Sequence, residues 1–165
     1  LDVKKGLNKK VKMISDGGIK FSGDIAKALA AGADAVMVGS MLAGTSEAPG
    51  KIIKKKGKLF KVFRGMGSVG AMNKGSADRY FQKKQKDKSK YVPEGVEGLI
   101  KYKGDVSKTI NKLVGGLRSS MGYLGAEQIK YLNKKAKFVK ITKAGFYESM
   151  VHSVEMTQKT INYKL

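Results

Sequence analysis

The chain has 165 residues, of which 41% are apolar, 28% are charged and two are Pro. This length and composition predict one domain, or part of one, with a packed core, and they exclude a disordered tail and a collagen-like chain. The residues include no Cys, so they offer no disulfide, thiolate metal site or cysteine nucleophile. No apolar run approaches the ~18 residues of a membrane span. The first residue is Leu1 and no secretory leader is visible, so we expect a piece of a longer cytoplasmic protein.

The net charge of +21 invites a nucleic-acid interpretation. Only Arg64, Arg79 and Arg118 are arginines, however, and proteins that read base sequence favour Arg. The densest lysine clusters, in residues 54–56 and 83–90, are not interleaved with stacking aromatic residues. We therefore expect a solvated lysine-rich surface and no nucleic-acid partner. A basic RNA-binding module is the alternative from another functional class.

The first third of the chain alternates strand-like and helix-like segments. Residues 11–15 form a short apolar strand. A helix follows, with Ser22 as its cap and Asp24 in its first turn, where a carboxylate suits the helix dipole. Apolar residues at helical spacing lead to Gly32, which ends this helix.

A second apolar strand over residues 35–38 leads into Gly39 and Ser40, and residues 41–43 are expected to start another helix. Nearly all-apolar strands that alternate with helices are typical of a parallel sheet covered by helices. The fold class is therefore α/β, although two such repeats are too few to close a barrel.

Residues 49–104 break this alternation. They predict a hairpin in residues 52–63 and a glycine-rich stretch in residues 65–75. A polar and partly helical stretch follows in residues 78–90, and a turn in residues 92–95. A stretch of this length inside an α/β unit is typical of a functional lid or an insertion.

Helical periodicity returns in residues 106–121. A shorter helix is expected around Ile129 and Leu132, followed by a strand over residues 138–142. The tail from Lys143 shows no periodicity.

Gly65, Gly67 and Gly70 match the dinucleotide-binding pattern G-x-G-x-x-G after a strand-like segment. That pattern requires a long helix and a second parallel strand, but Gly75 interrupts the segment that follows. We therefore expect no Rossmann unit. The glycines still allow backbone N–H groups to approach a ligand closely.

Polar groups follow both predicted parallel strands. The N–H groups and hydroxyl of Gly39 and Ser40 form a natural phosphate cradle, and Gly17 and Gly18 end the preceding strand similarly. Asp16 lies at the carboxyl end of the first strand, where ligands bind in α/β folds, and its carboxylate can accept hydrogen bonds from ribose hydroxyls. The alternatives are plain helix starts for the glycine turns and a capping role for Asp16.

Four further residues have simple structural interpretations. Arg79 and Tyr80 form a surface pair by composition alone, because an arginine normally stays protonated. Glu94 lies between Pro and Gly and is equally a turn residue. His152 is the only histidine, and without Cys or a second His it predicts no metal site.

Together these segments resemble the inosine-5′-monophosphate (IMP) dehydrogenase family. The resemblance covers roughly residues 11–163, in order, and rests on residues 15–19, 32–40, 63–68, 78–81, 92–98 and 113–123. It implies the C-terminal portion of a (β/α)8 TIM barrel with a long flap insertion. Residues 1–48 would form the last two βα units and residues 49–104 the active-site flap. Residues 105–142 would form terminal helices with a strand that closes the barrel, and residues 143–165 a C-terminal tail.

The family oxidises IMP to XMP with NAD in guanine nucleotide biosynthesis. A cysteine attacks purine C2, hydride passes to NAD, and water hydrolyses the covalent intermediate. The cysteine loop and the first six strands lie outside these residues, so we expect the parent protein, a homotetramer, to carry the activity. GMP reductase shares the barrel and is the close alternative; the pair Arg79 and Tyr80 argues against it, because a reductase needs no hydrolytic water.

The resemblance also implies substrate contacts. Asp16 would bind the ribose hydroxyls, and the 5′-phosphate would be bound by Gly18, Gly39 and Ser40. The purine would be held by backbone groups of Gly65, Met66 and Gly67, and its N1 edge by Glu94 with Gly95 beside it.

Catalytic and cofactor roles follow in the same way. Arg79 would activate the hydrolytic water, assisted by Tyr80, on a mobile flap whose closure excludes bulk water. Tyr123 would meet the NAD adenosine across a subunit boundary. A neighbouring subunit's K⁺ site would be completed by the backbone carbonyls of Glu148, Ser149 and Met150.

The sequence departs from the family at three places. Phe63 stands where a phosphate-binding tyrosine is usual, so one donor is lost. Met150 stands where a histidine is usual, but this change leaves the backbone carbonyl available as a ligand. Residues 3–12 do not resemble the segment that normally precedes the strand.

Overall fold

The computed structural model describes residues 1–8, 10–81 and 92–154. The chain forms two compact units: unit 1 comprises Leu1–Gly39 with Ser107–Leu165, and unit 2 comprises Ser40–Val106. No helix of the described residues is long and apolar enough to cross a membrane.

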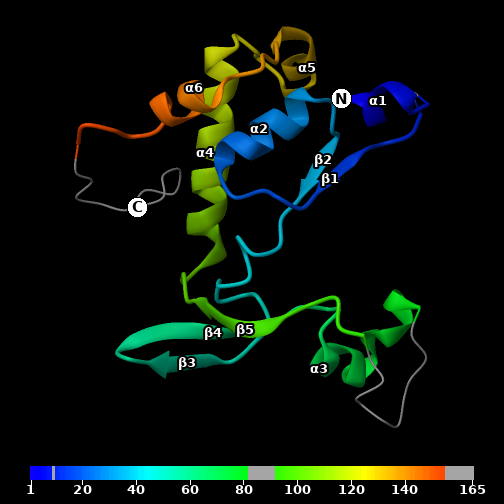
Figure 1. Ribbon diagram of the computed structural model, residues 1–165, viewed down its shortest axis with the longest axis vertical. Helices are drawn as coiled ribbons and strands as arrows, with labels where there is room; N and C mark the ends of the chain where they lie inside the picture. The colour runs from blue at the N-terminus through cyan, green and yellow to red at the C-terminus, as the bar shows by residue number, and fades with distance from the viewer. Residues whose placement is uncertain (9, 82–91, 155–165) are drawn as a thin grey trace. The chain divides into compact units, whose positions relative to one another are not determined.

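Unit 1 is built around a pair of parallel strands (Figure 1). Its elements, in chain order, are α1 (Asp2–Gly6), β1 (Ile14–Asp16), α2 (Ser22–Ala30), β2 (Ala35–Met37), the part of α4 (Val106–Tyr123) from Ser107 onward, η4 (Ile129–Tyr131), α5 (Leu132–Lys135) and α6 (Lys143–Glu148). The register pairs Ile14 with Ala35 and Asp16 with Met37, so the predicted parallel arrangement is confirmed.

The first turn of α2 is stabilised by Asp24 rather than by Ser22. Ser22 is the first helical residue and Phe21 the N-cap, so the prediction of Ser22 as cap is wrong by one position. The Asp24 carboxylate accepts the N–H groups of Lys20 and Phe21, each at 3.0 Å, and pairs with Lys27 at 2.8 Å. Burial opposes ionisation of this carboxyl, but its bonds with Lys27 and the two N–H groups lower its pKa.

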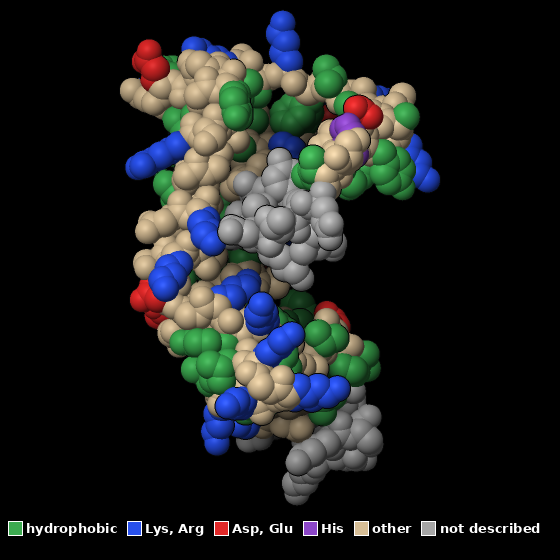
Figure 2. All heavy atoms as spheres, turned by 90° about the vertical axis from the view of Figure 1, so that its left-hand side faces the viewer, with side chains coloured by type: hydrophobic (Ala, Val, Ile, Leu, Met, Phe, Trp, Pro, Cys, Tyr) green, Lys and Arg blue, Asp and Glu red, His purple; other side chains and the backbone are tan. Residues whose placement is uncertain are grey.

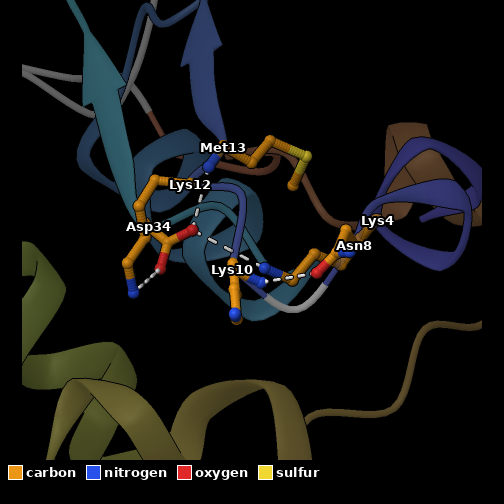
Figure 3. Close-up of polar contacts among 6 residues, drawn as sticks. All are labelled: Lys4, Asn8, Lys10, Lys12, Met13 and Asp34. Atoms are coloured by element: carbon orange, nitrogen blue, oxygen red, sulfur yellow. Dashed lines mark hydrogen bonds and ion pairs between the residues drawn. The ribbon is translucent and has the colours of Figure 1, made fainter.

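Asp34 fastens the amino-terminal edge of the parallel pair (Figure 3). Its carboxylate accepts the Met13 N–H at 2.9 Å, and Lys12 and Lys4 place their ammonium groups 3.4 and 3.6 Å away. The Met13 hydrogen bond is the main reason that the pKa of Asp34 is lowered. At the carboxyl-terminal edge of the strands, no described residue forms a comparable ion pair or side-chain hydrogen bond with Asp16.

Helices α2 and α4 lie against each other through a glycine (Figure 1). A Cβ added at Gly116 would overlap the side chain of Ser22, which is 3% exposed. Ile25 and Leu113 are buried on the same side, as expected from their helical spacing. The long periodic helix predicted for residues 106–121 is thus confirmed, and α5 confirms the shorter one.

Unit 2 contains an antiparallel sheet in the order β3 (Ile52–Lys55), β4 (Lys58–Arg64) and β5 (Glu97–Lys101). The hairpin is confirmed, with positive φ angles at Lys56 and Gly57 in its turn, whereas the third strand is a finding of the structure. Between β4 and β5 the described chain forms α3 (Val69–Ala71), the π-type turn η1 (Met72–Ser76) and the 3-10 turn η2 (Ala77–Tyr80). The rest of the predicted polar stretch, residues 82–90, lies outside the described residues.

Two predicted elements are wrong. Residues 41–43 form turns instead of a helix: the Lys103 ammonium binds the carbonyls of Ser40 and Met41, which a helix would need for its own ladder. Residues 138–142 form no strand and pair with no strand in the described chain. The tail, in which the sequence shows no periodicity, begins with the short helix α6, and Thr142 caps this helix by accepting the Gly145 N–H at 3.1 Å.

Candidate functional site

The carboxyl ends of β1 and β2 present the polar groups that the sequence predicts there. Asp16 ends β1 and is exposed, and its carboxylate has no hydrogen-bond or ionic partner among the described residues. Gly17 and Gly18 follow with φ angles of +87° and +74°, a conformation that other residues adopt only with strain. Gly39 follows β2 at the same edge, because the strands are parallel.

A second group of predicted residues meets within unit 2 at the glycine loop, defined here as residues 65–67. The Gly67 carbonyl accepts hydrogen bonds from the N–H groups of Glu94, at 2.9 Å, and Gly95, at 3.0 Å. The Gly65 N–H donates to the Val96 carbonyl at 2.9 Å. Residues almost thirty positions apart in the sequence therefore form one continuous backbone surface.

Side-chain packing joins Tyr80 to this surface. A Cβ on Gly67 would lie 2.9 Å from Tyr80 Cζ, so the phenol ring packs directly over the glycine. A Cβ on Gly95 would lie 2.9 Å from both the Gly67 carbonyl carbon and the Ser68 nitrogen. These approaches are closer than any Cβ allows, so glycine is required at both positions.

Arg79 precedes Tyr80 on η2 and is exposed. Its N–H donates to the Asp78 carboxylate at 2.9 Å, and its guanidinium forms no ion pair with a described residue. The guanidinium is thus available to a ligand or a water, next to a tyrosine that contacts the glycine loop.

Two polar contacts of this site were not predicted from the sequence. Ser76 Oγ donates to the Met66 carbonyl at 2.6 Å, and Glu97 Oε1 accepts the Gly70 N–H at 2.8 Å. Both fix the segment that follows the glycine loop. A serine and a glutamate in polar stretches carry no pattern that could have marked them, because their partners are backbone groups set by the loop's own path.

Phe63 is half-buried beside a pocket of about 430 Å³ in unit 2. Cationic side chains of Lys51, Arg64 and Lys74 line the same pocket, with Glu97 as its acidic member. The phenyl ring offers no hydrogen bond there, as the sequence predicts for this departure from the family.

The remaining predicted residues belong to unit 1. Tyr123 ends α4, is 91% exposed and lines an open pocket of about 430 Å³ with Leu124 and Phe138. Glu148 ends α6, and Ser149 follows as its C-cap. In the described part of the chain, no three His, Cys, Asp or Glu side chains form a group that could hold a metal.

Lysine side chains are spread over the face seen in Figure 2 and are interrupted by apolar and uncharged side chains. An interrupted distribution of lysines is the one expected of a solvated surface.

Comparisons with known proteins identify the family. A family model described as "IMP dehydrogenase / GMP reductase domain" matches residues 2–152. Inosine-5′-monophosphate dehydrogenase of Bacillus subtilis is 57% identical over 93% of this chain, and the Escherichia coli enzyme of that name is 56% identical over 94%.

Among solved structures, a GMP reductase variant from Trypanosoma brucei in complex with guanosine 5′-monophosphate shares the fold. Its TM-score is 0.74 and its identity 48%, over 88% of this chain and 28% of that protein. The chain spans about a third of its curated relatives, covering 31% of the B. subtilis protein and 32% of the E. coli protein. By its family match and these identities, the chain belongs to the IMP dehydrogenase / GMP reductase family of enzymes.

Proposed function

We propose that this chain is the C-terminal part of an IMP dehydrogenase, which oxidises IMP to XMP with NAD. The observation that carries the proposal is the meeting of Gly67 with Tyr80 and with Glu94 and Gly95. This contact joins the loop proposed to hold the purine to the pair proposed to activate water. A hydrolytic dehydrogenase needs both at one place.

Each part of the nucleotide has a matching group in the chain. The Asp16 carboxylate, which has no partner among the described residues, suits ribose hydroxyls, and N–H groups at Gly18, Gly39 and Ser40 suit a 5′-phosphate. The backbone of Gly65, Met66 and Gly67 would contact the purine, while Glu94 accepts from its N1 edge. Phosphate and ribose contacts orient the base, which gives the reaction its proximity advantage.

Arg79 is the proposed base of the hydrolytic step. Its guanidinium forms no ion pair with a described residue, which leaves it able to contact a water at the purine. Tyr80 lies next to it in the chain and packs on the glycine loop, and it is proposed to assist Arg79 in activating the water. Closure of the flap would exclude other waters from this position.

NAD, K⁺ and a second subunit complete the proposal. The exposed Tyr123 ring is suited to stack on an adenine, and NAD would accept the hydride when bound. The C-terminal end of α6 carries the negative end of its dipole, so the carbonyls of Glu148, Ser149 and Met150 suit a monovalent cation. Tyr123 and α6 would act across the interfaces of a cytoplasmic homotetramer.

The fold also supports a barrel fragment. Both parallel strands have large apolar side chains in the open: Ile14 on β1 is 58% exposed and Met37 on β2 is 50% exposed. Strands of a (β/α)8 barrel are covered by further strands and side-chain layers. We propose that the parent protein supplies the first six strands and the cysteine loop, and that residues 49–104 serve as the flap.

GMP reductase is the second candidate, favoured by the 48% identical solved structure. The two enzymes differ in the direction of hydride transfer and in whether a water hydrolyses an intermediate. The parent protein should form NADH and XMP from IMP and NAD, and Arg79→Ala should slow XMP release while a burst of NADH persists. Formation of IMP from GMP and NADPH would instead identify a reductase, and equal loss of both steps in Arg79→Ala would remove Arg79 from hydrolysis.

A further inference from the structure

The turn after β2, residues 40–44, contains the serine proposed to contact phosphate, and a lysine from another part of unit 2 holds it. Lys103 Nζ donates to the Met41 carbonyl at 2.8 Å and to the Ser40 carbonyl at 3.4 Å. The Lys103 N–H donates to the Gly44 carbonyl at 2.8 Å. Both the main chain and the side chain of Lys103 therefore bind the Ser40 turn.

The position of these carbonyls determines where the N–H groups of the turn point. In a trans peptide the C=O and the N–H point in opposite directions. Because Lys103 draws the Ser40 and Met41 carbonyls to its side, the N–H groups of Met41 and Leu42 face away from it. Neither N–H has a partner among the described residues. Two unpartnered donors thus continue the phosphate cradle that begins at Ser40.

Lys103 also brings an uncompensated charge to this turn. No carboxylate of the described chain forms an ion pair with it, and its acceptors are neutral carbonyls. Partial desolvation lowers its pKa, as expected for an ammonium without a counter-ion. A phosphate bound on the other side of the turn would supply the missing negative charge.

We infer that Lys103 is a positioning residue for nucleotide phosphate: its ammonium orients the Ser40 turn so that the N–H groups of Met41 and Leu42 face the phosphate. This inference rests on the proposed function for the identity of the nucleotide. Lys103 itself touches the turn's carbonyls and not the phosphate.

The test compares phosphorylated and unphosphorylated ligands in the full-length parent protein. Lys103→Met keeps the length of the side chain but removes its donors and charge. We expect about tenfold weaker binding of IMP, with kcat changed less than twofold and inosine binding unchanged, because inosine lacks the phosphate. Lys103→Arg should restore most of the IMP affinity. Lys101→Met, on the exposed end of β5, is the matched control and should bind IMP normally.

Equal weakening of IMP and inosine, or unchanged IMP binding in Lys103→Met, would overturn the inference. Failure of the proposed function looks different. If the wild-type protein binds IMP or GMP but does not oxidise IMP, the ratio of nucleotide to nucleoside affinity still tests Lys103. If it binds no 5′-phosphate nucleotide at all, the inference is overturned. Hydrogen exchange at the Thr45 amide, which donates to the Leu42 carbonyl at 3.0 Å, provides a separate readout, because loss of the Lys103 bonds should loosen the turn and accelerate it.

Discussion

A buried lysine on β4 offers the strongest quantitative prediction. Lys61 is 2% exposed, and its Nζ donates to the carbonyls of Thr45, at 2.5 Å, of Ser46, at 2.7 Å, and of Ala48. These bonds use all three N–H donors of the ammonium. The Lys61 ammonium therefore binds the loop of residues 45–48 as a metal cation would, through several carbonyls at once. Lys61→Met removes every donor at nearly constant side-chain length.

The magnitude follows from how deeply each carbonyl is buried. Hydrogen bonds to charged groups stabilise by ~1.5–3 kcal/mol each, and the buried Thr45 carbonyl would lose its donor, whereas those of Ser46 and Ala48 are part-buried and can be hydrated. Removing the ammonium also relieves its own desolvation. We therefore expect a net loss of about 3 kcal/mol, below the sum of the three bonds.

Hydrogen exchange at the Ser46 amide measures this loss locally, since that N–H donates to the Gly104 carbonyl at 2.8 Å. A loss of about 3 kcal/mol corresponds to about a hundredfold faster exchange. Lys58→Met, exposed at the start of β4, is the control and should leave exchange unchanged. Equal protection of Ser46 in Lys61→Met and wild type would refute the cation-like role.

Three further predictions concern other parts of the chain. Gly116→Ala should destabilise the fold by ~1–2 kcal/mol in thermal or urea unfolding, because the new methyl overlaps Ser22. Gly115→Ala is the control: its new methyl meets nothing within 4 Å, so it should stabilise the helix slightly. Equal effects of the two substitutions would contradict the close packing. The lowered pKa of Asp34 means that its stabilisation is complete above its ordinary value of 3.8 and is lost as the pH falls through the folded value. The Tm difference between wild type and Asp34→Asn should accordingly vanish in acid, and a constant difference would be evidence against this linkage. Phe63→Tyr should tighten IMP binding by ~1 kcal/mol in a calorimetric titration by restoring a phosphate donor; unchanged affinity would place Phe63 away from the phosphate.

Local patterns predicted the regular elements well where side-chain periodicity decides the structure. The apolar run ending at Asp16 and the one ending at Met37 are parallel strands, and periodic residues such as Leu113 form the long helix. The apolar segments on both sides of residues 54–58, with Gly57 in the turn, predicted the hairpin. These elements depend on neighbours in the sequence, which a pattern can represent.

Predictions failed where distant partners decide the structure. Residues 41–43 have helix-compatible side chains, but the Lys103 ammonium from sixty residues away takes the carbonyls that a helix needs. Likewise, β5 has no strand-like alternation of its own, and its pairing with β4 defines it. The contact of Tyr80 with Gly67 was not predicted, because these residues meet only through the fold of unit 2.

The most direct test of the account is a structure of the parent protein with IMP bound. The account predicts the 5′-phosphate on Gly39 and Ser40, the ribose hydroxyls on Asp16, and the purine against residues 65–67 with its N1 edge at Glu94. A nucleotide bound with its phosphate away from Ser40, or with its base away from residues 65–67, would contradict the proposed site.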